Sequence, residues 1–425
     1  MEAPEAFVQE TGPAESGDVT QARSINDALP PELLSIILNE YLNVRYEGMC
    51  AAWTCSHWRA LMGPKLDRGV VPLRGDSDTT FAERAAGEGR LALLQWARAN
   101  GCPWDVAICE AAAEHGHLDV LRWARANGCP WDGMTCASAA LGGHFDILQW
   151  ARTNDCQWDA YTCAYAALGG HIDILRWARA NGCPWDDLTC QFAARGGHLE
   201  VLKWARHNEC PWSAGVCADA AGGGHTEIVV WARANGCPWS ATACDCAAGN
   251  GHMSTLEWTL ANGQSSTTAC SRAAHNGRFE ILRRLHERAY PWDEYTCAGA
   301  ASCGRLDMLQ WARDHDCPWD ASTIAEAAAG GHMDVLVWAR DNDCPWDKRA
   351  CAWAAKHDRV DVLSWLRAGG CPWDDLTCLL ACETGALKAL VWARDNGCLW
   401  NRRKCRAKAM ERHDKTMVAW IDAQP

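Results

Sequence analysis

The chain has 425 residues, of which 26 are Trp and 26 are Cys, and its formal net charge at pH 7 is −13. A chain of this length ordinarily divides into two or three domains unless it is an extended repeat array. The acidic balance, 53 Asp and Glu against 40 Lys and Arg, argues against non-specific nucleic-acid binding, which needs a basic surface.

Residues 1–24 are polar and rich in Ala, Glu, Gly and Ser, which predicts a disordered leader. They have neither the basic start nor the apolar core of a secretory signal. No stretch of the sequence approaches the roughly 20 apolar residues that cross a membrane. We therefore expect an intracellular, cytoplasmic protein that has no membrane contact and whose thiols are reduced rather than arranged as a disulfide framework.

Apolar residues at helical spacing follow in residues 25–65. The stretch from LPPELLSIIL to CSHWRAL resembles an F-box, whose pattern opens with L-P-x-E-[LI]-[LI] and closes with V-C-x-x-W-R-x-L. This box is short, and Thr54 stands where the family prefers Val. The resemblance implies docking of a Skp-type adaptor of a cullin–RING ubiquitin ligase, through Leu29, Pro30, Leu33, Ile37 and Trp58. The alternative is an amphipathic helical cap that shields the first repeat.

From residue 78 to 425 the sequence repeats with a step of 27 residues. One series of Trp residues passes through positions 96, 123, 150, 177, 204, 231, 258, 311, 338, 365 and 392, and a second passes through 104, 131, 158, 185, 212, 239, 292, 319, 346, 373 and 400. We count about thirteen repeats, so internal duplication decides the architecture.

Each repeat predicts two short antiparallel helices. The residue after the second Trp is a helix N-cap former in every case: Asp78, Asp105, Asp132, Asp159, Asp186, Ser213, Ser240, Ser266, Asp293, Asp320, Asp347, Asp374 and Asn401. A Gly-Gly pair, as at Gly142–Gly143, separates the two helices, and Asn-Gly closes the second in a left-handed turn. Such helix pairs cannot bury their apolar faces alone, so the repeats must stack.

The connector ANGCPWD, first at Ala99–Asp105, joins consecutive repeats. Its Trp is predicted to plug the seam between repeats, and a dozen such indoles would supply most of the core. The Cys residues are predicted to be small buried hydrophobes, because thiols seven residues apart in one repeat, or equivalent thiols in successive repeats, fit neither a zinc site nor a disulfide. The His at the turn, as at His144, is predicted to bond backbone between the helices. Arg90, Arg278 and Arg305 replace it, so we expect no metal and no cofactor.

The repeat resembles an ankyrin repeat, whose slots are matched here by Thr135, Ala139, Ala140, Gly143, His144, Asp146, Ile147, Leu148 and Trp150. The resemblance implies an all-α fold: an ankyrin-like helical-pair solenoid preceded by the small helical F-box-like segment. About six residues are missing from each repeat where the family forms its β-hairpin finger. Arrays of this short, Trp- and Cys-rich kind after an F-box resemble proteins of giant DNA viruses, which would place the chain in the host cytoplasm or nucleus.

One position of the first helix varies while the surrounding frame is constant. The second residue after its Cys slot reads Ala111, Ser138, Tyr165, Phe192, Asp219, Cys246, Arg272, Gly299, Glu326, Trp353 and Leu380. Variation on a fixed lattice is typical of a recognition face, with neutral drift at exposed sites as the alternative. The aromatic residues Tyr165, Phe192 and Trp353 are the predicted target-binding anchors, because exposed aromatics are favoured hot spots.

No phosphate loop, nucleophile elbow or paired-carboxylate signature is present, so we expect a protein that is not an enzyme. The expected function is substrate recognition for a Skp–cullin–F-box ligase, in which the repeats bind an unknown protein target. The alternative is an ankyrin-repeat scaffold that binds or sequesters a host protein without recruiting a ligase. A third class is a zinc- or redox-active Cys and His protein. Apart from its partners, the chain is expected to be a monomer.

Overall fold

The computed structural model describes residues 80–99, 102–263 and 266–424. The predicted leader and the F-box-like segment, with Leu29, Pro30, Leu33, Ile37 and Trp58, lie outside the described residues. By its internal contacts the chain divides into two compact units, Met1–Trp131 and Asp132–Pro425, which we call the N-terminal and C-terminal units. No helix in the described part is long and apolar enough to cross a membrane.

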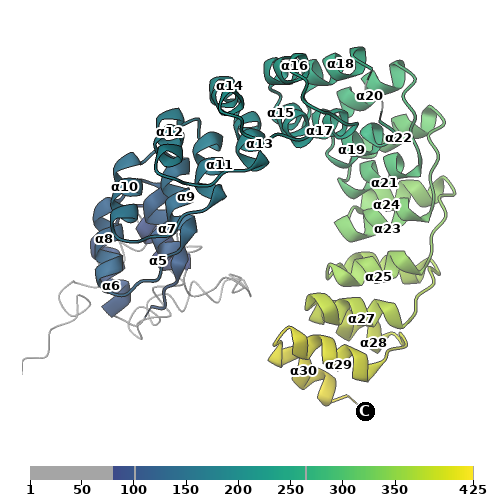
Figure 1. Cartoon of the computed structure of the whole chain (residues 1–425). Coiled ribbons are helices and arrows are strands. Elements are labelled where there is room, and N and C mark those ends of the chain that lie inside the picture. Colours follow the sequence, from purple (N-terminus) through teal and green to yellow (C-terminus); the bar gives the residue numbers. More distant parts are fainter. Residues whose placement is uncertain (1–79, 100–101, 264–265, 425) are drawn as a thin grey trace, which may run out of the picture. The chain divides into compact units, whose positions relative to one another are not determined.

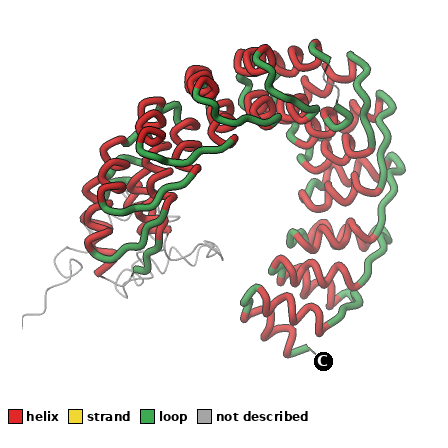
Figure 2. Tube along the Cα trace, in the orientation of Figure 1, coloured by secondary structure: helices red, strands yellow, loops and turns green. Residues whose placement is uncertain are grey.

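Within the described ranges the structure has 26 helices, in thirteen consecutive pairs, and no strand (Figure 2), which confirms the all-α prediction. The first helices of the pairs are α5 (Thr80–Gly87), α7 (Val106–Glu114), α9 (Gly133–Gly142), α11 (Ala160–Leu168), α13 (Asp187–Arg195), α15 (Gly215–Gly222), α17 (Thr242–Asn250), α19 (Ala269–His275), α21 (Glu294–Ser302), α23 (Ala321–Gly330), α25 (Lys348–Lys356), α27 (Asp375–Thr384) and α29 (Arg402–Glu411). The second helices are α6 (Leu91–Ala99), α8 (Leu118–Ala126), α10 (Phe145–Thr153), α12 (Ile172–Ala180), α14 (Leu199–His207), α16 (Thr226–Ala234), α18 (Met253–Ala261), α20 (Phe279–Glu287), α22 (Leu306–Asp314), α24 (Met333–Asp341), α26 (Val360–Ala368), α28 (Leu387–Asp395) and α30 (Lys415–Asp422).

The helices of the C-terminal unit stack in the manner of a solenoid (Figure 1). Each odd-numbered helix packs against the odd-numbered helices beside it and against the even-numbered helix of its own repeat. The even-numbered helices contact one another much less. The odd-numbered helices therefore form a close layer, and the even-numbered helices a looser one.

The core consists of small and aliphatic side chains rather than indoles. In the repeat of α11 and α12 the fully buried residues include Cys163, Ala167 and Leu175. Every Trp whose side chain the structure describes is only half-buried, so the prediction that Trp supplies most of the core is wrong. The odd-numbered helices approach through Ala and Cys, which leaves no room for an indole between them. The rings lie instead at the seams of the looser layer, where the connector Trp was predicted.

Helix capping follows the predicted pattern in most repeats. The side chains of seven Asp residues accept a hydrogen bond from the backbone N–H two residues later: Asp105, Asp132, Asp159, Asp186, Asp320, Asp347 and Asp374. The Asn401 side chain also caps its helix, but it accepts from the backbone N–H of Lys404, three residues later. Ser213 and Ser240 are not caps, because α15 and α17 begin one residue later, behind Ala214 and Ala241. The Ser213 hydroxyl instead accepts a bond from the Gln191 amide at 3.2 Å.

Candidate protein-binding surface

Within the C-terminal unit, the variable positions lie on consecutive odd-numbered helices and form a row that we call the variable row. It includes Tyr165 on α11, Phe192 on α13, Asp219 on α15, Glu326 on α23 and Trp353 on α25. These five side chains are half-buried rather than fully exposed. The buried Ala and Cys frame beneath them holds their spacing constant, because neighbouring odd-numbered helices pack directly.

The first part of the row in the C-terminal unit is an aromatic cluster. The rings of Tyr165 and Phe192 meet edge-on with centroids 5.6 Å apart, and Tyr161 lies 6.4 Å from Tyr165. Tyr161 is 44% exposed and gives the cluster an open edge. The Arg195 guanidinium lies over the Phe192 ring at 5.1 Å and pairs with Asp219 at 2.9 Å. Three rings bordered by an ion pair therefore stand side by side on one surface, an arrangement typical of interface hot spots.

The structure brings together two of the three predicted anchors. Tyr165 and Phe192 touch, whereas Trp353 lies on α25, in a different part of the unit. Sequence analysis did not identify Tyr161, Arg195 or Asp219 as members of one cluster. Helical spacing could have identified two of them. Tyr161 lies four residues before one variable position and Arg195 three residues after another, so each shares a helix face with that position.

The middle of the row is polar. The Ser302 hydroxyl lies 3.0 Å from His275 Nδ1, and it donates to the carbonyl of Gly299 at 2.8 Å. Burial raises the pKa of Glu326, an effect that the nearby His275 partly offsets. The row is therefore aromatic at Tyr165 and Phe192, titratable at Glu326 and aromatic again at Trp353.

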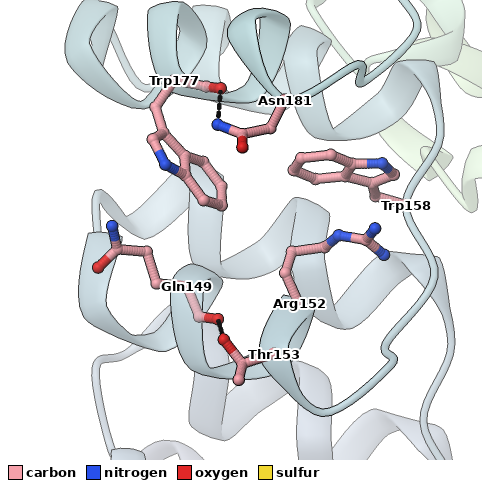
Figure 3. Close-up of a pocket in the computed structure, with 6 residues that line it drawn as sticks. All are labelled: Gln149, Arg152, Thr153, Trp158, Trp177 and Asn181. Carbon is pink, nitrogen blue, oxygen red and sulfur yellow. Dashed lines mark hydrogen bonds between the residues drawn. The ribbon is translucent and has the colours of Figure 1, made fainter.

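The seam between α10 and α12 contains an open cavity of about 440 Å³. Figure 3 shows Trp158 and Arg152 on one side of it and Trp177 and Gln149 on the other. The Arg152 guanidinium stacks on Trp158 at 4.2 Å, and the two indoles meet edge-on at 5.7 Å. The Asn181 amide donates to the carbonyl of Trp177 at 2.8 Å. Similar Arg–Trp stacking recurs along the array, so we assign the cavity to the joint between repeats rather than to a ligand.

The turn His residues bond backbone as predicted, but the acceptor lies in the preceding repeat. His171 Nε2 is 3.0 Å from the carbonyl of Leu141, and His332 Nε2 is 3.1 Å from that of Ser302. Arg278 and Arg305 make the same link, donating to Gly249 and Gly277 at 3.3 and 3.2 Å. The turn His therefore ties repeats together rather than joining the two helices of one repeat.

Among the residues that the structure describes, no group of three or more His, Cys, Asp or Glu side chains is placed to hold a metal ion. None of the described cysteines is in a disulfide, and nearly all are buried. The connector Cys lies against the helix turn that carries the Cys 20 residues earlier: Cys183 Sγ donates to the carbonyl of Asp159, four residues before Cys163, at 3.3 Å. Sequence analysis compared thiols seven and 27 residues apart and missed this spacing.

Comparison with known families supports the repeat architecture. Residues 163–206, which run from within α11 into α14, match a family model described as ankyrin repeats in many copies. A comparison with curated proteins finds no match. Repeats of this kind indicate a role in protein–protein interaction.

Proposed function

We propose that this ankyrin-type array binds a protein target through the variable row and presents it to a ubiquitin ligase through the F-box-like segment. The observation that supports target binding is the cluster of Tyr161, Tyr165 and Phe192 beside the Arg195–Asp219 ion pair. Half-buried rings on a rigid layer lose little conformational freedom on binding, and the flanking charges add specificity.

The ligase role rests on the sequence of residues 25–65. An adaptor would bind Leu29, Pro30, Leu33, Ile37 and Trp58, which match the F-box pattern in order. This arrangement separates the two tasks, because the adaptor-binding residues precede the repeats and the variable row lies on them. The competing proposal is a scaffold that holds a protein without recruiting a ligase.

The deciding experiment is co-purification of the full chain with a purified Skp-type adaptor. We expect the wild-type chain to retain the adaptor and the Leu33→Asp variant to lose it, because a carboxylate cannot enter an apolar docking face. Tyr165→Ala is the matched control and should retain the adaptor fully. Failure of the wild-type chain to bind would refute the ligase role and favour the scaffold.

A second measurement addresses the target surface. Proteins that co-purify with the wild-type chain should be lost from the double variant Tyr165→Ala/Phe192→Ala while the adaptor remains bound. The matched double variant Gln149→Ala/Arg176→Ala, which changes the even-numbered helices instead, should retain the co-purifying proteins. If both double variants retain the same proteins, the variable row is not the binding surface.

A further inference from the structure

Fourteen cysteines of the C-terminal unit form a regular series of thiol pairs, and Cys382 and Cys405 interact outside this series at a spacing of 23 residues. Each pair combines the Cys of an odd-numbered helix with the connector Cys 20 residues later, whose Sγ donates to the carbonyl of the residue four positions before the helix Cys. The pairs are Cys136–Cys156, Cys163–Cys183, Cys190–Cys210, Cys217–Cys237, Cys297–Cys317, Cys351–Cys371 and Cys378–Cys398. Both members of every pair are fully buried.

The backbone holds the connector thiol against the helix turn that carries its partner. Cys183 Sγ donates to the carbonyl of Asp159 at 3.3 Å, and Cys156 Sγ donates to that of Asp132 at 3.2 Å. Each of these Asp residues is the N-cap of the helix whose Cys stands four residues later, so the carbonyl lies in the same helical turn as the partner thiol.

In the Cys297–Cys317 pair, each thiol lies close to a backbone carbonyl of the other residue's segment. Cys297 Sγ lies 3.9 Å from the carbonyl of Cys317, and Cys317 Sγ lies 3.5 Å from that of Asp293. The proximity of the two residues is therefore a property of the fold rather than of one side-chain rotamer.

Three repeats break the pairing and supply internal controls. Cys244 and Cys270 have Gln264 and Tyr290 in the connector slot, and Cys344 has Ile324 in the helix slot. Burial raises the pKa of Cys244 to about 11 and those of Cys270 and Cys344 to about 12. These three thiols are as deeply buried as the paired ones but lack a thiol in the pairing slot.

In four of the pairs the pKa of one thiol is lowered by its partner, namely that of Cys183, Cys217, Cys371 or Cys398. The hydrogen bond from Cys163 lowers the pKa of Cys183 despite burial, and the Arg179 guanidinium acts in the same direction. The thiolate is the nucleophilic form of Cys, so a pair contains both an attacking sulfur and a resolving thiol.

We propose that these thiol pairs are oxidation sites, at which hydrogen peroxide converts each pair into one disulfide bond. One thiolate attacks a peroxide oxygen and breaks the O–O bond, giving a sulfenic acid and a hydroxide that takes up the proton released by the thiol. The partner thiol then attacks the sulfenic sulfur, the S–S bond forms, and the sulfenic oxygen leaves as water. Overall, two thiols and one peroxide give one disulfide and two waters.

Because the thiols are buried, peroxide reaches them when a connector opens transiently. The product would close a loop from the first helix of a repeat to the connector after its second helix. It would thus cross-link both helices of that repeat and restrict its unfolding.

The test is peroxide titration of the folded, fully reduced full chain, followed by alkylation of the remaining thiols and mapping of disulfide-linked peptides by mass spectrometry. We expect links within the seven pairs, and loss of free paired thiol roughly tenfold faster than loss of Cys244, Cys270 and Cys344. Links that join different pairs, such as Cys136 to Cys183, or equal loss of paired and lone thiols, would overturn the proposal.

Two variants make the test independent of global stability. Ile324→Cys restores the missing slot and should create a new link to Cys344 at a rate within about threefold of the neighbouring pairs, since the backbone is shared. Cys163→Ala should abolish the link at Cys183 and leave the 190–210 link in place. Failure of the Ile324→Cys variant to link, in a chain whose other pairs do, would show that the 20-residue spacing does not define the site.

Discussion

At the scale of single residues, the turn glycine carries two separate constraints. Gly143 has φ 79°, a left-handed conformation that residues with a Cβ rarely adopt. A Cβ at this position would also lie 2.5 Å from Cε1 of His171, the residue that bonds back to the preceding repeat. Gly182 is left-handed as well, with φ 82°, but a Cβ there would meet nothing within 4 Å.

These two glycines make a matched experiment. Gly182→Ala should lower the free energy of unfolding by about 1 kcal/mol through backbone strain alone. Gly143→Ala should lower it by about 2 kcal/mol more, because the new methyl group displaces the His171 ring and its inter-repeat bond. Urea denaturation followed by circular dichroism measures both losses. Equal losses in the two variants would mean that the His contact contributes nothing.

The half-buried carboxyl of Glu326 predicts a pH-dependent stability. Burial raises its pKa in the folded chain above its ordinary value of 4.5, so the folded state holds the proton more tightly than the unfolded state. The resulting penalty is absent well below pH 4.5, grows as the pH rises through the folded pKa, and is complete above it.

Glu326→Gln should therefore stabilise the protein at about pH 7 to 8 and change its stability little below about pH 4. Thermal unfolding at a series of pH values gives the difference curve. Glu287→Gln, at an exposed position of α20, is the control and should show no comparable rise. A Glu326→Gln difference that does not depend on pH would exclude the half-buried carboxyl as its cause.

Features whose chemistry is local, such as the helix caps, were predictable from the sequence. The Asp caps at Asp132 and Asp186 depend only on the helix that they start, so the residue type was sufficient to identify them. The position of the indoles was not predictable in this way. Whether Trp158 enters the core depends on how closely helices of successive repeats approach, and that is set by the Ala and Cys residues of other segments.

At the scale of helices and connectors, stacking of Arg on Trp fastens most of the even-numbered helices to the next connector. On α12 the Arg179 guanidinium lies 4.3 Å above the Trp185 ring and also donates to the carbonyl of Cys183. Arg176, on the same helix, lies 5.9 Å from Trp204 and 3.9 Å from Asp173, with its side chain 53% exposed. Only the first of these two cations bridges a helix and a connector through both a ring and a hydrogen bond.

Arg179→Lys should therefore lower the free energy of unfolding by about 1–2 kcal/mol, because an ammonium group cannot stack and bond the carbonyl at once. Arg176→Lys on the same helix should change it by less than about 0.5 kcal/mol. Urea denaturation measures both losses. Both substitutions keep the positive charge, so a difference between them is not due to net charge. Similar losses would indicate that stacking on Trp185 is not stabilising.

The 27-residue period was the strongest signal in the sequence, and together with the cap and turn residues it was sufficient to predict the paired helices. The pairing of Cys163 with Cys183 was not found, because those residues belong to different elements and meet only when the second helix folds back. Likewise, the sequence predicted which positions belong to the variable row but not which of their side chains touch. Its aromatic cluster depends on the packing of α11 directly beside α13, which the repeat pattern does not specify.

At the scale of the whole molecule, the C-terminal unit is held together by contacts within one repeat or between adjacent repeats. Stability in such an array is approximately a sum of repeat and interface terms. One joint departs from the others in sequence, since the connector between α18 and α19 reads NGQSST and lacks the Cys, the Pro and the Trp. Its described polar contacts include Thr268 Oγ1 donating to Asp245 at 2.8 Å and a bond between Ser266 and the same carboxylate.

We therefore expect the array to lose cooperativity at this joint. In urea, the wild-type chain should unfold in more than one step, and amide exchange should be fastest in α18 and α19, which flank the altered connector. Replacing Gln264–Ser265 with Cys-Pro-Trp restores the 27-residue step and supplies a thiol for Cys244, so it should raise the first unfolding midpoint and bring the steps together.

Replacement of the same two residues with Ala-Gly-Ser is the control, because it restores the length without the ring or the thiol. Circular dichroism is the appropriate probe, since the added Trp would disturb fluorescence. If the control raises the midpoint as much as Cys-Pro-Trp does, the connector length alone sets the coupling. A wild-type chain that unfolds in one step would instead mean that hydrogen bonds to Asp245 join the two sides of the array as firmly as an indole does.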